Sequence, residues 1–199
     1  GFVGRRLVVA LQQKQVDMRL LSRNKQNKDT IICDLKIDCI PNDALIDVDT
    51  VFHLAGFAHD MRDASKISDL YYKVNVSATV QLANLAVKSG VKRFVFVSSV
   101  KAGGNPPLGI CANEKDQKNT GDVYGKTKRE AELKLLKIGK ESDMHVSIIR
   151  PSLVYGPNVK GNLQLMLSGI ARGWFPPLPE TGNKRSMIHV DDLVLAIVF

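Results

Sequence analysis

The chain has 199 residues, of which 44% are hydrophobic and 6% aromatic, and its formal net charge is +8. This composition excludes collagen, coiled coils and intrinsic disorder, because no repeat or low-complexity tract is present and the apolar residues suffice for a core. No apolar run approaches the roughly 18 residues that a membrane-spanning helix needs. The cysteines Cys33, Cys39 and Cys111 have no metal-ligand spacing, which predicts a protein of the reducing cytoplasm.

Apolar periodicity predicts the secondary structure along the chain. In chain order we expect a helix after Gly4, strands at 18–22, 30–34 and 50–55, a helix at 66–88, a strand at 94–98, a loop at 102–120, a helix at about 123–138, a strand at 146–149 and a helix at 163–171. Gly90 stands where a helix C-cap is expected. The β-branched and aromatic run at 94–98 is typical of a strand buried on both faces. Because strands alternate with helices, we predict a parallel α/β sheet covered by helices on both faces.

Both ends of the sequence predict a fragment of a longer protein. The chain begins Gly1-Phe2-Val3-Gly4, without a methionine or a signal-peptide pattern, and it ends in the apolar run 193–199. A chain that starts directly at a helix would lack the first strand of such a sheet. After Pro151 the alternation weakens, and Gly- and Pro-rich loops around the helix at 163–171 indicate a small, irregular cap region.

Two short segments predict contacts with a dinucleotide. Gly1 and Gly4 open the first helix, where glycines let the backbone approach a pyrophosphate at the helix N-terminus; plain turn chemistry, common for two glycines at a helix start, is the alternative. Ser22 and Arg23 end the strand at 18–22, where an acidic residue would bind the ribose hydroxyls of NAD and a basic one the 2′-phosphate of NADP. They favour NADP, with a solvated basic loop as the alternative.

The pair Tyr124 and Lys128 is the sharpest chemical feature. Residues four apart lie on one face of a helix. We expect the ammonium, together with a cationic nicotinamide, to lower the pKa of the phenol from its usual value of about 10. Tyr124 could then exchange a proton with a sugar or alcohol hydroxyl while a hydride moves to or from the cofactor. Ser99 follows the strand at 94–98 and is a candidate to hold the same oxygen; surface decoration is the alternative for the pair taken alone.

Other polar residues predict no further site. No two of the four histidines are four residues apart and no carboxylate cluster accompanies them, so we expect no metal. His53 and His189 are expected to be structural, and Asp191 or Asp192 to cap the closing helix. No continuous basic stripe with interleaved aromatic residues indicates nucleic-acid binding, and helical salt pairs explain the charges at 126–140.

Together these motifs resemble the extended short-chain dehydrogenase/reductase family, in its NAD-dependent epimerase/dehydratase branch, nearly from end to end. The resemblance implies that Ser99, Tyr124 and Lys128 are catalytic. With Ser22 and Arg23 added, the implied cofactor-binding residues are Gly1, Phe2, Val3, Gly4, Ser22, Arg23, Asp34, Leu35, Leu54, Ala55, Gly56, Asn75, Val97, Ser98, Tyr124, Lys128, Pro151 and Ser152. The implied substrate-binding residues are Ser99, Asn162 and Arg185.

The resemblance implies a Rossmann-like, doubly wound sheet in an N-terminally truncated dinucleotide-binding domain, 1–157. The start of a substrate-binding region, 158–199, would be partly interleaved with it. It also implies a cytoplasmic enzyme that uses NAD or NADP to epimerise C4 of a nucleotide-activated sugar, similar to UDP-glucose 4-epimerase. A homodimer through the two long helices that hold Val74 and Tyr124 is expected. Neither a nucleic acid nor a membrane is an expected partner.

Departures from the family pattern keep other activities open. The family's dehydratases usually carry Asp-Glu where this chain has Val100-Lys101, so dehydration is disfavoured. Leu153 replaces an asparagine common in the epimerases and, with Arg23, favours an NAD(P)H-dependent 4-keto reductase of surface-polysaccharide synthesis, which would use the same residues. The remaining alternatives are a non-catalytic NAD(P)-binding regulatory or assembly protein and a dehydrogenase of a steroid or flavonoid precursor.

Overall fold

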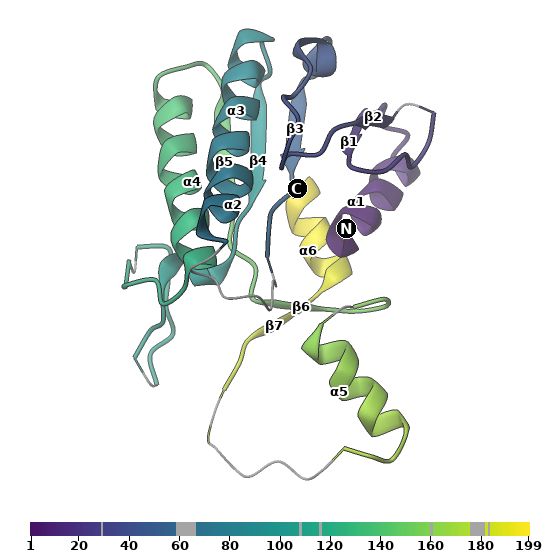
Figure 1. Ribbon diagram of the computed structural model, residues 1–199, viewed down its shortest axis with the longest axis vertical. Helices are drawn as coiled ribbons and strands as arrows, with labels where there is room; N and C mark the ends of the chain where they lie inside the picture. Colours follow the sequence, from purple (N-terminus) through teal and green to yellow (C-terminus); the bar gives the residue numbers. More distant parts are fainter. Residues whose placement is uncertain are drawn as a thin grey trace. The chain divides into compact units, whose positions relative to one another are not determined.

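The structure is a computed structural model that describes residues 1–28, 30–58, 67–107, 109–115, 117–159, 161–175, 182 and 184–199 (Figure 1). The chain forms two compact units. One consists of Gly1–Val16 together with Pro151–Phe199, and the other of Asp17–Arg150. The predicted division into functional domains at 157 and 158 stays a prediction.

The strands confirm the predicted parallel α/β class. Within the described residues they form three separate parallel sheets: β1 (Leu20–Ser22) with β2 (Thr30–Ile32), then β3 (Thr50–His53), β4 (Arg93–Val97) and β5 (His145–Ile149) in that order, and β6 (Leu153–Tyr155) with β7 (Met187–His189). The β6–β7 pair was not predicted, because a strand of three residues is too short to show a period of two.

Two long helical segments lie side by side in the Asp17–Arg150 unit (Figure 1). One is α2 (Ser68–Tyr72), a π-helical turn (Lys73–Ser77) and α3 (Ala78–Lys88), and the other is α4 (Val123–Lys140). They confirm the helices predicted at 66–88 and 123–138, of which residue 66 lies outside the described residues. Gly90 has φ +74°, a left-handed conformation that glycine adopts without strain, so its predicted place after the helix end is confirmed.

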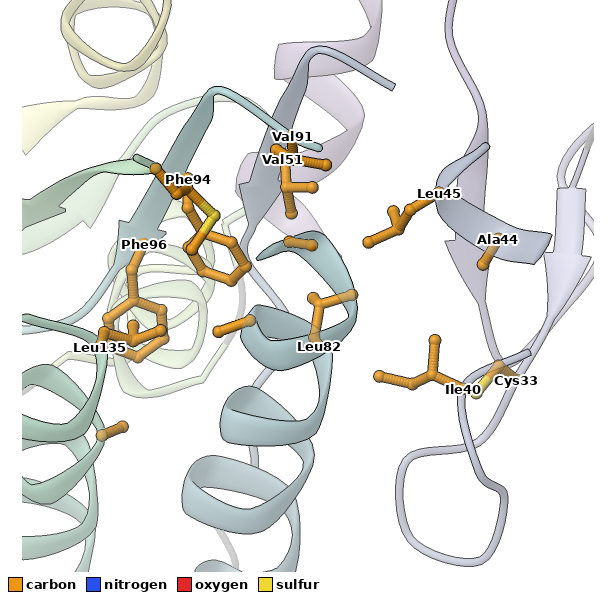
Figure 2. Close-up of a cluster of buried hydrophobic side chains, with 14 residues drawn as sticks. Cys33, Ile40, Ala44, Leu45, Val51, Leu82, Val91, Phe94, Phe96 and Leu135 are labelled. Atoms are coloured by element: carbon orange, nitrogen blue, oxygen red, sulfur yellow. The ribbon is translucent and has the colours of Figure 1, made fainter. Parts of the chain in front are cut away.

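The hydrophobic core of this unit lies between the β3–β4–β5 sheet and these helices, and it extends to the segment between β2 and β3 through Cys33, Ile40, Ala44 and Leu45 (Figure 2). Phe94 and Phe96 are fully buried and pack near Leu82 of α3 and Leu135 of α4. The opposite face of β4, with Val95 and Val97, is only half-buried. The predicted burial of this strand on both faces is therefore met on one face only.

In the other unit, α1 (Phe2–Gln13) packs on α6 (Val190–Val198), and α5 (Asn162–Ala171) is its third helix. Arg6 donates to both carboxylate oxygens of Asp191, at 2.8 and 2.7 Å. The prediction that Asp191 or Asp192 caps α6 is wrong: β7 runs directly into the helix, and the cap is His189, whose Nδ1 accepts from the Asp191 N–H at 3.3 Å. Both aspartates lie in the first turn, where the helix dipole favours negative charge.

Candidate active site

Ser99 and Tyr124 meet at the carboxyl end of β4. Ser99 follows the strand and caps the 3-10 turn Val100–Gly103, where its Oγ accepts from the Lys101 N–H at 3.3 Å. The Ser99 side chain is also hydrogen-bonded to the Tyr124 phenol. Tyr124 lies in the first turn of α4, which Asp122 caps by accepting from the Gly125 N–H at 2.7 Å. The structure thus brings together two of the three predicted catalytic residues by direct contact.

Gly125 makes this contact possible, and sequence reasoning missed it. A Cβ at this position would lie 2.6 Å from the Lys101 carbonyl oxygen, closer than real side chains come. Only glycine therefore lets the start of α4 approach the turn after Ser99 so closely. Lys101 also bridges the two elements through its ammonium, which is 2.6 Å from Asp122 Oδ2. A glycine directly after the tyrosine was the available signal in the sequence.

The phenol of Tyr124 is less acidic than predicted. Burial raises the pKa of Tyr124 above its usual value near 10, and Asp122 and Tyr71 act in the same direction. The hydrogen bond from Ser99 acts to lower it, but burial is the larger cause. Lys128 is not among the groups that shift the pKa of Tyr124 in the structure, so a lowering by the ammonium alone is not found, and its predicted effect together with a cationic nicotinamide stays a prediction.

Lys128 lies one turn after Tyr124 and is only 3% exposed. Its Nζ donates to the Val97 carbonyl oxygen at 2.8 Å and lies 4.1 Å from the centroid of the Phe96 ring. Burial lowers the pKa of Lys128 to about 8, while Glu132 acts to raise it. The ammonium is thus a buried cation at the end of β4, with a proton that leaves more readily than that of an ordinary lysine.

Asn75 ties the segment after β3 to this site. Its Oδ1 accepts from the Phe57 N–H at 2.6 Å, and its Nδ2 donates to the Phe57 carbonyl at 3.0 Å and to Thr127 Oγ1 at 3.1 Å. A Cβ on Gly56 would lie 3.4 Å from Asn75 Oδ1 and 3.7 Å from Lys128 Nζ. Gly56, Asn75 and Lys128 are therefore neighbours, and the Asn75 amide orders the backbone there.

Ser98 supplies a further polar group at the same strand end. It is 4% exposed, and its hydroxyl has no hydrogen-bond partner among the residues that the structure describes. A buried hydroxyl without a partner costs free energy, so such a group indicates a place where a ligand donates or accepts. Because the carboxyl ends of parallel strands share one edge, the segments after β3 and β4 converge on it.

The other predicted site residues are found in both units. Ser22 ends β1 and Arg23 follows it, exposed, while Asp34-Leu35 follows β2 and Leu54-Ala55 follows β3. The Gly1–Val16 and Pro151–Phe199 unit carries the remaining ones: Gly1, Phe2, Val3 and Gly4 at the start of α1, Pro151 and Ser152 before β6, Arg185 before β7, and Asn162 at the start of α5. The side chain of Asn162 lies outside the described residues.

The carboxylates of α4 and its end confirm two of the predicted helical salt pairs, but a third carboxylate pairs outside the helix. Glu130 pairs with Lys134 at 2.9 Å and Glu141 with Lys137 at 3.9 Å, as expected of helical salt pairs. Glu132 instead pairs with Arg150.

In the described part of the chain no group of three His, Cys, Asp or Glu side chains could hold a metal ion, and no helix there is both long and apolar enough to cross a membrane.

The model of the NAD dependent epimerase/dehydratase family matches residues 1–199. The chain belongs to this family. It is 38% identical over 208 residues to a UDP-glucose 4-epimerase of Vibrio cholerae, a match that covers 100% of this chain and 63% of that protein. It is 31% identical over 204 residues to an N-acetyl-alpha-D-glucosaminyl-diphospho-ditrans,octacis-undecaprenol 4-epimerase of Escherichia coli O157:H7, which covers 98% of this chain and 58% of that protein.

A solved structure also resembles this member of the epimerase/dehydratase family. MoeE5 in complex with UDP-glucose and NAD matches with a TM-score of 0.86 at 28% identity, over 100% of this chain and 68% of that chain. The match confirms the predicted Rossmann-like fold. This chain spans less than two thirds of the length of either curated relative.

Proposed function

We propose that the protein carrying this chain is an NAD(P)-dependent enzyme that epimerises C4 of a nucleotide-activated sugar. The arrangement of Ser99, Tyr124 and Lys128 carries the proposal: a serine hydroxyl hydrogen-bonded to a phenol, with a buried ammonium one helical turn away. Two relatives named as 4-epimerases support the choice of reaction. The structure of MoeE5 in complex with UDP-glucose and NAD supports the classes of substrate and cofactor.

Each of the three residues has a distinct role in this proposal. Tyr124 takes the proton of the C4 hydroxyl as a general base and returns it as a general acid. Ser99 favours the phenolate by donating to the phenol oxygen, and with substrate bound it would donate to the C4 oxygen in place of the phenol. Lys128 holds a positive charge at the end of β4, where it would anchor the ribose of the cofactor and, together with the cationic nicotinamide, favour the phenolate. The nicotinamide cofactor, when bound, supplies the acceptor and donor of the C4 hydride.

The residues present fit a nicotinamide dinucleotide. Ser98 offers a buried hydroxyl that lacks a partner among the described residues, and Gly56 leaves room beside Lys128 where a side chain would stand. On α1 the N-cap is Gly1, and an added Cβ at Gly4 would meet nothing within 4 Å, which suits a close approach of a diphosphate. Arg23, exposed at the end of β1, supports NADP over NAD.

A 4-keto reductase of surface-polysaccharide synthesis is the second candidate, favoured by Arg23 and by Leu153. The position of Lys101 argues against a dehydratase, because its side chain is a cation paired with Asp122 rather than an acid. A cofactor assay separates the two candidates. Stoichiometric loss of NADPH absorbance with a nucleotide 4-keto sugar would overturn the epimerase, and conversion of a UDP-hexose without net change of cofactor would overturn the reductase.

A non-catalytic regulatory protein or a dehydrogenase with another substrate would leave UDP-hexoses unchanged. We expect Tyr124→Phe to reduce turnover of a UDP-hexose by roughly 10²–10⁴-fold, because it removes the proton-transfer group. Tyr72→Phe, on an exposed tyrosine of α2, is the matched control and keeps full turnover. Equal turnover by both variants would refute the catalytic assignment.

We further propose that Asn162 and Arg185 contact the nucleotide diphosphate and that the protein is a cytoplasmic homodimer. Leu133 and Leu136, exposed on α4, support an interface through the long helices. Light scattering after chromatography tests it: Leu133→Lys is expected to halve the measured mass, and an unchanged mass would contradict this interface.

A further inference from the structure

Two opposite charges on α4 are buried one turn apart and yet are not paired with each other. Lys128 is 3% exposed and Glu132 is 2% exposed. Residues at this spacing lie on the same helix face, with Cβ atoms about 5–6 Å apart, and commonly form ion pairs. Among the residues that the structure describes, however, Lys128 bonds to the Val97 carbonyl and Glu132 to Arg150. Some feature of the fold therefore keeps the two side chains apart.

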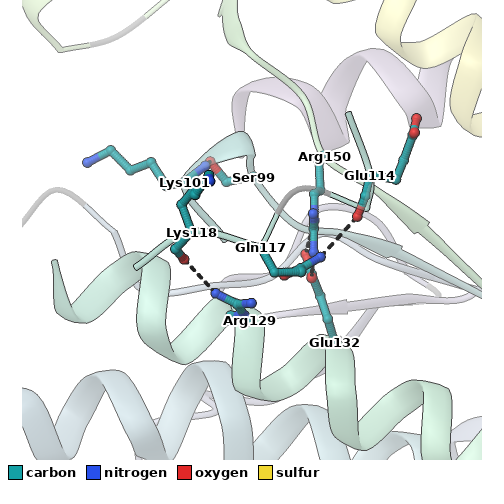
Figure 3. Close-up of polar contacts among 8 residues, drawn as sticks. All are labelled: Ser99, Lys101, Glu114, Gln117, Lys118, Arg129, Glu132 and Arg150. Carbon is teal, nitrogen blue, oxygen red and sulfur yellow. Dashed lines mark hydrogen bonds and ion pairs between the residues drawn. The ribbon is translucent and has the colours of Figure 1, made fainter. Parts of the chain in front are cut away.

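Arg150 is that feature. It follows β5 directly, and its guanidinium spans the Glu132 carboxylate: Nε lies 3.0 Å from Oε1 and 3.1 Å from Oε2, and a second guanidinium nitrogen also bonds to Oε2 (Figure 3). A fork of this kind satisfies both carboxylate oxygens in a fixed direction, which a lysine could not do. The pair therefore ties α4 to the end of β5 and commits both oxygens of the Glu132 carboxylate to a partner other than Lys128.

Because Glu132 is buried, the stability of its carboxylate depends on which cation it pairs with. A carboxylate that is almost wholly out of water is strongly destabilised unless a cation compensates it. If Arg150 were removed, Lys128, four residues earlier, would be the buried cation at pairing distance along α4, since Arg129, three residues earlier, donates to the Lys118 carbonyl at 2.7 Å. Pairing of the two would draw the ammonium off the Val97 carbonyl oxygen, which it now contacts at 2.8 Å.

We propose that Arg150 is a positioning residue for Lys128: by holding the Glu132 carboxylate, it keeps the Lys128 ammonium on the Val97 carbonyl, beside Gly56 and at the end of β4. The turnover part of this inference rests on the proposed function, whereas the position of the ammonium does not. Nothing in the arrangement requires Arg150 to touch substrate or cofactor.

The surroundings of Lys128 make its titration a direct readout. The titratable groups around it are Tyr124 and Glu132 on α4 and His53 on β3, with Arg150 acting through Glu132. The pKa of His53 is lowered to about 3, so this ring is neutral near pH 7. The pKa of Tyr124 is raised, so the phenol is neutral as well. Glu132 is therefore the one anion among these groups. The direction in which its carboxylate points decides how strongly Lys128 holds its proton.

The test is an NMR titration of the purified, ligand-free protein labelled with ¹⁵N at the lysine Nζ. In the unchanged protein Lys128 should titrate near pH 8, apart from ordinary lysines near about 10.4. In Arg150→Met we expect the Lys128 titration to move up by about one pH unit or more, since Glu132 then faces the ammonium. An unchanged or lowered titration would overturn the proposal.

Further variants keep the test decisive if Arg150→Met folds poorly. Arg150→Lys retains a cation without the fork, so a smaller upward shift is expected, and no shift counts against the proposal. Glu132→Gln combined with Arg150→Met removes the anion and should return the Lys128 titration to near pH 8 or below. Arg93→Met, which breaks the exposed pair with Asp49 at the start of β4, is the matched control and should leave Lys128 unchanged.

Turnover of a UDP-hexose separates this inference from the proposed function. We expect Arg150→Met to lower kcat about tenfold with little change in KM, and the double variant to recover most of the loss. A shifted Lys128 titration with unchanged kcat would support the positioning by Arg150 and refute the role given to Lys128 in catalysis. An unshifted titration overturns the positioning whatever the activity.

Discussion

Acidification from pH 7 to pH 5 is expected to destabilise the protein, with about 2 kcal/mol of the loss caused by His53 alone. This residue lies on β3 and is 4% exposed. Its Nε2 is 2.9 Å from Thr79 Oγ1, and its ring stacks on Phe96 with centroids 5.5 Å apart. Burial, with a smaller contribution from Lys128, lowers the pKa of His53 from 6.5 to about 3.

The sign follows from which state binds the proton. Between pH 6.5 and about 3 the unfolded chain is protonated at His53 while the folded chain is not. The stability contributed by the neutral, buried ring is therefore complete above pH 6.5 and is lost progressively as the pH falls toward 3. With these two pKa values, linkage gives a loss of about 2 kcal/mol between pH 7 and pH 5.

Urea unfolding at the two pH values measures this loss. His53→Gln is less stable at both, because it loses the ring stacking, but its free energy of unfolding should fall by about 2 kcal/mol less on acidification than that of the unchanged protein. His145→Gln, at an exposed position that begins β5, is the control and should respond to pH as the unchanged protein does. The reasoning is refuted if His53→Gln loses as much stability on acidification as the unchanged protein.

Three further substitutions test other parts of the structure. Ser99→Ala removes the hydrogen bond that lowers the pKa of Tyr124, so the phenolate absorbance that Tyr124→Phe abolishes should appear at higher pH; an unchanged or lower pH would contradict the assignment. Phe94→Ala should lower the free energy of unfolding in urea by about 3–5 kcal/mol, because the side chain is fully buried in the core, and a loss below about 1 kcal/mol would contradict that burial. Gly104→Ala should lower the melting temperature more than Gly109→Ala: both glycines have positive φ, but only at Gly104 would the Cβ meet a backbone carbonyl, at 2.7 Å, so equal losses would exclude the clash.

The sequence was sufficient for the parallel α/β class and for the long helices. Helix α4 and the segment from α2 to α3 repeat their apolar pattern over several turns, and β4 is apolar after Arg93, so their type could be predicted without tertiary information. The three-residue strands β6 and β7 carry no such pattern. Their pairing depends on segments more than thirty positions apart along the chain, which no local rule relates.

Partners of polar residues were harder to predict than elements. Glu132 has Lys128 at helical spacing, yet it pairs with Arg150, 18 positions later and just after another element. His189 caps α6 instead of an aspartate, because β7 enters the helix without an intervening turn. In each case the way in which two elements meet decides which partner the polar residue binds. The local sequence pattern does not depend on that partner and so could not predict it.

Burial acts on both ionisable groups of the site by disfavouring their charged forms, so that the pKa of Tyr124 is raised and that of Lys128 is lowered to about 8. Among the groups that act on Tyr124 in the described structure, Ser99 is the one that favours the phenolate. The Ser99 bond exists because α4 begins against the turn that Ser99 caps, and Gly125 permits this approach. The capacity of Tyr124 to ionise is therefore coupled to a backbone contact. A side chain at position 125 would impair proton transfer without touching the phenol.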